Sequence, residues 1–225
     1  MSHRDNILVV TGTDTEIGKT TVACGLVRGL VDRGVDVRAI KPVESGIDEL
    51  AVEQRDGVRL AEAARQEEPG RALTELTRPL APPEAAEIDG VELDYDAWVA
   101  TVEEASRSAD LVIVEGAGGL LSPLTWQQTA RDLAVDLQAR VLLVAPDALG
   151  VLNHSLMAYE LLESAGLEVA GIVFSRSTEG DESTDKNPRT FRRFSGFDRV
   201  AALPRIDGWR DGVEHLETPI GWVSP

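Results

Sequence analysis

Short apolar runs rich in β-branched residues recur along the chain, and longer segments with a helical period separate them. The apolar runs cover residues 6–11, 36–40, 111–114, 141–145, 169–174 and 199–203. Strands that are buried on both faces lose the alternation of polar and apolar positions, so these runs predict strands of a parallel sheet. The helical patterns cover residues 19–32, 57–65, 95–106, 129–138 and 152–164.

The alternation of strand and helix predicts an α/β fold made of right-handed βαβ units. We expect a doubly wound, mainly parallel sheet with helices on both faces, formed by one domain that spans residues 1–225. Ligands of such sheets bind at the carboxyl ends of the strands. Residues 67–94, rich in Pro, Glu and Gly, and the polar residues 177–188 are expected to be loops.

The composition narrows the choice of partners. The chain carries 39 acidic and 22 basic residues, for a formal net charge of -17, so nucleic acid and anionic membranes would be repelled. It has no 18-residue apolar run and no secretory signal pattern, which predicts a cytoplasmic protein. Only three residues are lysines, Lys19, Lys41 and Lys186. The single cysteine, Cys24, lies in an apolar helical pattern and is assigned no chemistry.

A glycine-rich loop directly follows the first predicted strand and precedes a predicted helix. It reads Gly-Thr-Asp-Thr-Glu-Ile-Gly-Lys-Thr over residues 12–20. Backbone N–H groups of such a loop and of the helix N-terminus form a cradle for phosphates. Lys19 would supply charge to the β- and γ-phosphates and Thr20 a hydroxyl to Mg²⁺. The loop is a variant phosphate-binding loop (P-loop), because five residues instead of four separate Gly12 from Gly18.

Four ordered motifs carry a resemblance to a known family. The segment TGTDTEIGKTTV contains the P-loop, and KPVESG (41–46), VEGAGG (114–119) and LGVLNH (149–154) each follow a predicted strand. Together they resemble the dethiobiotin synthetases, which are P-loop NTPases. The resemblance implies an ATP- and Mg²⁺-dependent ligase that joins CO₂ to 7,8-diaminononanoate, closes the ureido ring and releases dethiobiotin, ADP and phosphate. It also implies a homodimer.

The same resemblance assigns roles to individual residues. Lys19 and Lys41 would neutralise charge on the transferring phosphoryl group. Asp56 taken alone would pass for a helix N-cap, but the resemblance favours a metal ligand beside Thr20 and Glu115. The substrate-binding residues would be Thr15, Ser45, Ala117, Gly118 and, from the other subunit, Gly150 and Asn153. The ATP-binding residues would be Glu16, Ile17, Gly18, Lys19, Thr20, Thr21, Asp56, Glu115, Gly116, Ala117, Gly118, Ser175, Arg176, Pro204, Arg205, Ile206 and Asp211.

The resemblance weakens towards the C-terminus, where family members carry an asparagine that reads the adenine edge and this chain has Ser175. Two other functions remain open: a variant P-loop ligase or amidase acting on another acid, and a partition or positioning ATPase. Such ATPases usually carry a lysine early in the loop, where this chain has Thr13 and Asp14. A catalytically idle ATP-binding regulator is disfavoured by Lys19, Thr20, Lys41 and Glu115.

The excess of acidic residues and the scarcity of lysine predict adaptation to high salt. Like charges on the surface repel one another, and at about 1 M salt the screening length falls to about 3 Å. We therefore expect the midpoint of thermal unfolding and the turnover number to rise between low and molar KCl. An activity maximum at low ionic strength would contradict this prediction.

Overall fold

The computed structural model, which describes residues 4–176 and 179–225, contains a six-stranded sheet in the order β2-β5-β1-β6-β7-β8. All its neighbouring strands run parallel, which confirms the predicted fold class. Each of the six predicted strands is present. Their bounds are β1 Arg4–Gly12, β2 Val37–Ile40, β5 Leu111–Glu115, β6 Ala139–Pro146, β7 Val169–Ser175 and β8 Val200–Leu203.

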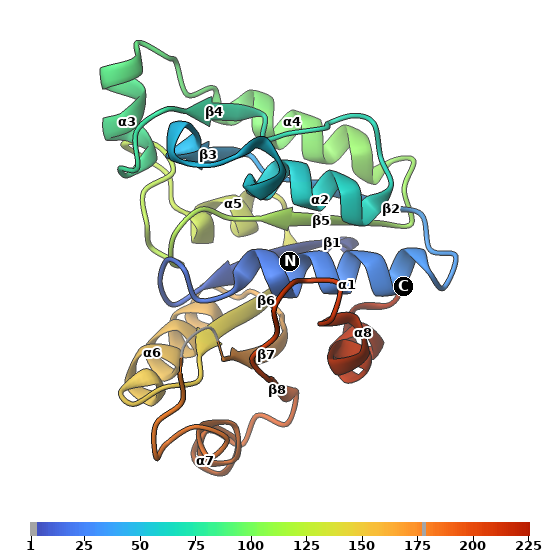
Figure 1. The fold of residues 1–225 in the computed structure, drawn as a ribbon, viewed down its shortest axis with the longest axis vertical. Helices are drawn as coiled ribbons and strands as arrows, with labels where there is room; N and C mark the ends of the chain where they lie inside the picture. Colours follow the sequence, from blue (N-terminus) through green and yellow to red (C-terminus); the bar gives the residue numbers. More distant parts are fainter. Residues whose placement is uncertain (1–3, 177–178) are drawn as a thin grey trace.

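Helices cover both faces of the sheet (Figure 1). The predicted helices are observed within a few residues of their expected bounds, as α1 Lys19–Val31, α2 Asp56–Ala64, α4 Tyr95–Ser106, α5 Ala130–Asp136 and α6 Val151–Ser164. Two more helices follow, α7 Asn187–Ser195 and α8 Glu217–Val223. The described residues also contain three 3₁₀ turns, η1 Ile47–Glu49, η2 Val52–Gln54 and η3 Val213–Leu216.

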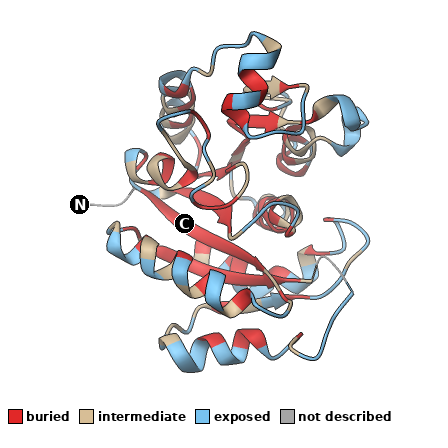
Figure 2. Ribbon diagram, turned by 90° about the vertical axis from the view of Figure 1, so that its left-hand side faces the viewer, coloured by how far each residue is buried: buried red, intermediate tan, exposed pale blue. Residues whose placement is uncertain are grey.

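The buried strands divide their side chains between two hydrophobic cores. In β1, Leu8 and Val10 pack in a core with α1, α2 and α8, whereas Ile7 and Val9 pack in a second core with α4, α5, α6 and α7. Successive side chains of a strand point to opposite faces, so one apolar run serves both cores. Figure 2 shows the consequence, with buried strands between helices that are buried on one side and exposed on the other.

The expectation that residues 67–94 form a loop is wrong. This segment contains β4 Thr74–Leu76 and α3 Pro82–Asp89, and β4 pairs in parallel with β3 Val43–Ser45 in a separate two-stranded sheet. Pro82 and Pro83 suggest a loop in the sequence, but in the structure they form the first turn of α3, a position that proline fits. Strands of three residues are too short to show a period. Figure 1 shows α3, β3 and β4 together at the upper end of the molecule.

The described part of the expected loop 177–188 is a loop up to its last two residues. Residues 179–186 form turns and irregular structure, and α7 begins at Asn187. Residues 177–178 of that expected loop lie outside the described part of the chain. Within that part, no helix is long and apolar enough to cross a membrane.

The parallel register brings the carboxyl ends of the strands to one edge of the sheet. Ile40 pairs with Val114, Val10 with Glu115, and Gly12 with Val144. On the far side, Pro146 pairs with Ser175 and Ser175 with Leu203. The residues that follow β1, β2, β5, β7 and β8 therefore lie along this edge, where the sequence placed most of the candidate site residues.

We predict that the C-terminal third unfolds together with the rest of the chain, as one domain. Phe191 of α7 is fully buried and packs edge to face against Phe174 of β7, with ring centroids 5.8 Å apart. Phe191→Ala should lower the free energy of unfolding by about 3–5 kcal/mol and shift a single denaturation transition. Phe194→Ala, on the same helix but 75% exposed, is the matched control. A separate early transition of the C-terminal part would contradict the single domain.

Candidate functional site

The glycine-rich loop ends in a helix start whose N–H groups are not capped by a side chain. Gly18 has a φ of +92°, a conformation that favours glycine, and α1 begins at the next residue. No side chain caps this N-terminus. The free N–H groups of the first turn and the positive end of the helix dipole suit a phosphate group. Glu16, Thr20 and Thr21 lie on the same stretch, and Ile17 is buried beneath it.

Lys41 is the centre of a buried charge cluster at the ends of β2 and β5. Its ammonium donates to Asp56 Oδ2 at 2.9 Å, to Glu115 Oε1 at 2.7 Å and to the Gly116 carbonyl at 3.3 Å. Glu115 is fully buried, and its Oε1 also accepts a hydrogen bond from Thr20 Oγ1 at 2.8 Å. The Lys41 ammonium therefore joins the two strand ends to the first residue of α2, and Glu115 extends the cluster to the first turn of α1.

Burial and charge act in opposite directions on this cluster. Burial tends to lower the pKa of Lys41, but the charges of Asp56 and Glu115 outweigh it and raise that pKa. Burial raises the pKa of the Glu115 carboxyl against the opposing effect of Lys41. For Asp56, Lys41 and the Thr20 hydroxyl overcome the effect of burial, so its pKa is lowered. Lys41 is accordingly held in the charged form.

Lys19 lies close to the same cluster. Its Nζ donates to the backbone carbonyl of Asp14 at 2.6 Å, a contact within the loop itself. Burial, together with repulsion from Lys41, lowers its pKa to about 8. An anion placed between Lys19 and Lys41 would relieve that repulsion.

The oxygen atoms around this cluster fit a magnesium ion. The Glu115 Oε2 atom is buried and makes no hydrogen bond within the described part of the chain. An orphaned carboxylate oxygen is costly unless a ligand satisfies it. Asp56 and Glu115 both contact the Lys41 ammonium, and Thr20 adds a hydroxyl. Among the described residues, no group of three or more Asp, Glu, His or Cys side chains is placed to hold a metal ion. Mg²⁺ usually binds one or two carboxylates and keeps several waters.

Glu44 is a buried acidic residue that the sequence did not single out. Its carboxylate accepts hydrogen bonds from the N–H groups of Asp56, at 2.6 Å, and Gly57, at 3.0 Å. Burial and the nearby Asp56 raise the pKa of Glu44, and the two N–H groups oppose them. Asp56 is the first residue of α2, and its carboxylate contacts Lys41 instead of capping the helix. Glu44 on β3 caps the start of α2 instead. This contact is distant in the sequence, so no local pattern predicts it.

The residues predicted to contact the substrate lie around the loops after β1, β3 and β5. Thr15 is exposed, and its methyl lies 4.0 Å from the position that a Cβ on Gly118 would take. Ala117 adjoins Gly118 in the segment after Glu115. Ser45, at the end of β3, has a buried Oγ without a hydrogen-bond partner. That orphaned hydroxyl is a candidate contact for a polar ligand.

The residues predicted to bind the nucleotide base lie on the other side of the loop. A Cβ on Gly18 would come within 2.5 Å of Ser175 Oγ, so Ser175 borders the P-loop directly. The Arg176 N–H donates to the Leu203 carbonyl at 3.0 Å, which places the end of β7 beside the segment 204–206. Pro204, Arg205 and Asp211 are exposed and Ile206 is half-buried.

Gly150 and Asn153 are both exposed at the uncapped start of α6. The buried Asp147 holds the segment before this helix, because its carboxylate accepts from Asn187 Nδ2 at 2.7 Å and from the Asp185 N–H at 2.8 Å. The Asp181 carboxylate also accepts a hydrogen bond from the Leu149 N–H at 2.8 Å. The polar loop after β7 thus fixes the start of α6.

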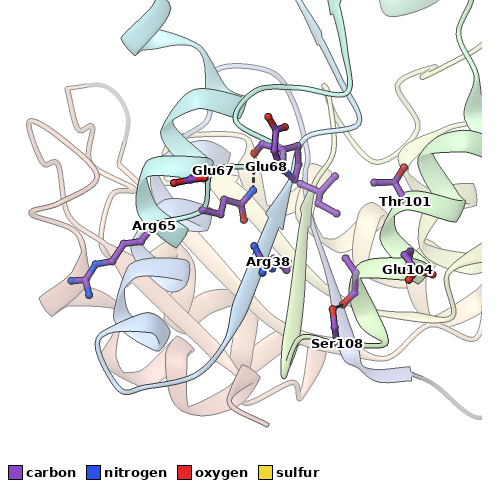
Figure 3. A pocket seen from close by; sticks show the side chains of 11 residues that line it. Arg38, Arg65, Glu67, Glu68, Thr101, Glu104 and Ser108 are labelled. Atoms are coloured by element: carbon purple, nitrogen blue, oxygen red, sulfur yellow. Dashed lines mark hydrogen bonds between the residues drawn. The ribbon is translucent and has the colours of Figure 1, made fainter.

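A pocket of about 660 Å³ lies elsewhere, between β2, the segment 65–69 and the C-terminal half of α4. Figure 3 shows Arg38, Arg65, Glu67, Glu68 and Glu104 among its lining residues. None of the residues predicted from the sequence lines it. Its mixed, exposed charges provide no convergent set of groups for catalysis, so the edge with the P-loop is the stronger candidate site.

The chain is similar to proteins of known name over most of its length. A family model described as an AAA domain matches residues 6–211. The ATP-dependent dethiobiotin synthetase BioD of Anaeromyxobacter sp. (strain K) is 42% identical over 219 residues, covering 96% of each chain. The protein of the same name from Caulobacter vibrioides (strain NA1000 / CB15N) is 38% identical, and the match covers 91% of this chain and 95% of that protein. The one from Aquifex aeolicus (strain VF5) is 33% identical, with 88% of this chain and 89% of that protein covered.

Solved structures share the fold at low sequence identity. The septum site-determining protein MinD complexed with Mg-ADP from Pyrococcus horikoshii OT3 has a TM-score of 0.58 at 17% identity, covering 97% of this chain and 91% of that one. Chloroplast FtsY from Physcomitrella patens has a TM-score of 0.55 at 16% identity, covering 100% of this chain and 67% of that one. These likenesses concern the fold alone.

We predict that nucleotide choice is relaxed, because a serine hydroxyl has fewer hydrogen-bonding groups than an amide at the base edge. Ser175 is only 3% exposed and borders Gly18, so it has little reach towards a base. The ratio of kcat/KM values for ATP, GTP and CTP measures this. A preference for ATP above roughly a thousandfold would show that other groups, such as the backbone near Pro204, read the base.

Proposed function

This chain belongs to the ATP-dependent dethiobiotin synthetase family, and from that premise we propose that it carboxylates 7,8-diaminononanoate with CO₂ and closes the ureido ring at the expense of ATP. The observation that carries the proposal is the convergence of Lys41, Asp56, Glu115 and Thr20 beside an uncapped P-loop helix. That arrangement offers positive charge and oxygen ligands to a triphosphate, and no protein nucleophile is needed.

The proposed reaction depends on holding two anions together. One amine of the substrate takes up CO₂ to form a carbamate, whose oxygen attacks the γ-phosphate and releases ADP. The second amine then attacks the carbon of the mixed anhydride, closing the ring and releasing phosphate. Lys19 and Lys41 are proposed as the catalytic residues, because their charges would neutralise the phosphoryl and carbamate oxygens from two sides.

Magnesium is proposed to bind at Thr20, Asp56 and Glu115, with water completing its ligands. When bound, it would offset negative charge on the phosphate oxygens of ATP. Of the protein groups, Thr20 would offer its hydroxyl and Glu115 its unpartnered Oε2. Lys41 would move its hydrogen bonds from the carboxylates towards the anions.

A homodimer is proposed to complete the substrate site. The P-loop and the two lysines are committed to phosphate and carbamate, so the distant carboxylate of the substrate needs separate donors. Gly150 and Asn153 lie exposed at the uncapped start of α6, where helix N–H groups suit a carboxylate. A two-fold axis would present this helix start of each subunit to the site of the other. Within one subunit, Thr15, Ser45, Ala117 and Gly118 would contact the diamine end.

The direct test is ATP hydrolysis that requires both diaminononanoate and bicarbonate, with dethiobiotin as the product. Lys19→Ala and Lys41→Ala should each lower turnover by roughly a hundredfold or more, because the lost charge acts most strongly in the transition state. Lys186→Ala is the matched control, since Lys186 is exposed and its ammonium donates to the nearby Glu182 carbonyl. Wild-type turnover in Lys41→Ala would remove Lys41 from the mechanism.

A shared site predicts complementation between two inactive subunits. Asn153→Asp introduces a negative charge that should repel the substrate carboxylate, while Lys19→Ala cannot use ATP. Purified heterodimers of the two variants should recover about half of the wild-type activity, because one of the two sites then has both functional halves. If heterodimers form but remain inactive, each carboxylate site lies within a single chain.

A further inference from the structure

The start of α2 depends on a residue that belongs to another element. Glu44 lies on β3, three residues after Lys41, and is only 4% exposed. The Asp56 N–H donates to Glu44 Oε1 at 2.6 Å, and the Gly57 N–H donates to Glu44 Oε2 at 3.0 Å. A carboxylate at a helix N-terminus is favoured by the free N–H groups and the helix dipole. Both oxygens therefore hold backbone groups and are not directed at a ligand.

The same helix start also packs closely against the segment that leads into β4. A Cβ on Gly57 would lie 2.2 Å from the backbone nitrogen of Ala72 and 2.6 Å from the carbonyl carbon of Arg71. The helix start thus cannot shift towards residues 71–72, and its first two N–H groups are bound to Glu44. With the helix start fixed by these contacts, Asp56 directs its carboxylate to the Lys41 ammonium at 2.9 Å.

We propose that Glu44 is a positioning residue that fixes the Asp56 carboxylate for the divalent cation and Lys41. The inference rests on the proposed function, since it assigns Glu44 a part in the same site. Glu44 also connects two halves of that site along the chain, because Lys41 precedes β3 and Ser45 ends it. A shift of β3 would move Lys41, Ser45 and Asp56 together. The alternative is that Glu44 serves as an ordinary helix cap, whose loss lowers stability alone.

The experiment uses Glu44→Gln in the full-length protein. Glutamine keeps the shape and one acceptor oxygen but turns an amide NH₂ towards an N–H donor. Direct Mn²⁺ binding in the presence of ADP, followed by electron paramagnetic resonance, should weaken by about tenfold or more. Glu44→Asp keeps the charge, and its Mn²⁺ affinity should lie between those of wild type and Glu44→Gln. It also serves as the test variant if Glu44→Gln does not fold.

A double-mutant cycle separates positioning from a purely structural role. If Glu44 acts through Asp56, Glu44→Gln should weaken Mn²⁺ binding much less in an Asp56→Asn background than in the wild-type background. Asp94→Ala is the stability control, because Asp94 caps the remote helix α4 by accepting from the Ala97 N–H at 2.9 Å. It should lower the unfolding temperature without changing Mn²⁺ affinity.

Two results would overturn the inference. One is unchanged Mn²⁺ affinity in Glu44→Gln and Glu44→Asp with a loss of stability like that of Asp94→Ala. The other is additive effects of the Glu44 and Asp56 substitutions on Mn²⁺ affinity. Failure of the proposed function would look different, because wild-type protein would then lack ATP hydrolysis dependent on diaminononanoate and bicarbonate, whatever Glu44 does.

Discussion

A lysine ammonium removed from water needs carboxylate partners, and this requirement organises the whole site. Lys41 is buried, and Asp56 and Glu115 contact it from a helix and a neighbouring strand. Removing one member would leave an uncompensated buried charge, which is strongly destabilising. These groups come from the end of β2, the end of β5 and the start of α2, so the three elements must keep one relative arrangement. The register of β2 against β5 provides it, because Ile40 pairs with Val114 immediately before Lys41 and Glu115.

The order of strands extends this arrangement across the sheet. The P-loop follows β1, which lies between β5 and β6. The buried charges at the ends of β2 and β5 lie on one side of the loop, and Ser175 and Arg176 at the end of β7 lie on the other. A nucleotide on the loop would extend from its base near β7 and β8 to its reacting end near β2. The α6 start, held by Asp147 and Asp181, is a third point on the same edge.

Some errors of the sequence reading share one cause. The segment 67–94 looks like a loop because it is rich in Pro and Glu, yet it forms β4 and α3. Its strand exists only because β3 pairs with it, and pairing between residues 43–45 and 74–76 leaves no local pattern. Glu44 was missed for the same reason, since its two hydrogen bonds reach residues 12 and 13 positions away. Asp56 was ambiguous from its own neighbourhood, and only the contact with Lys41 distinguishes its carboxylate from a cap.

The sequence alone determined the fold class, the six strands of the main sheet and the variant P-loop, because periodicity and loop spelling are local properties that survive without any tertiary context. It also indicated the family through four ordered motifs. Tertiary structure decided which groups meet: Lys41 with Asp56 and Glu115, Ser175 with Gly18, and Glu44 with the start of α2. Such contacts depend on strand order and register, which bring distant residues together through packing over the entire domain.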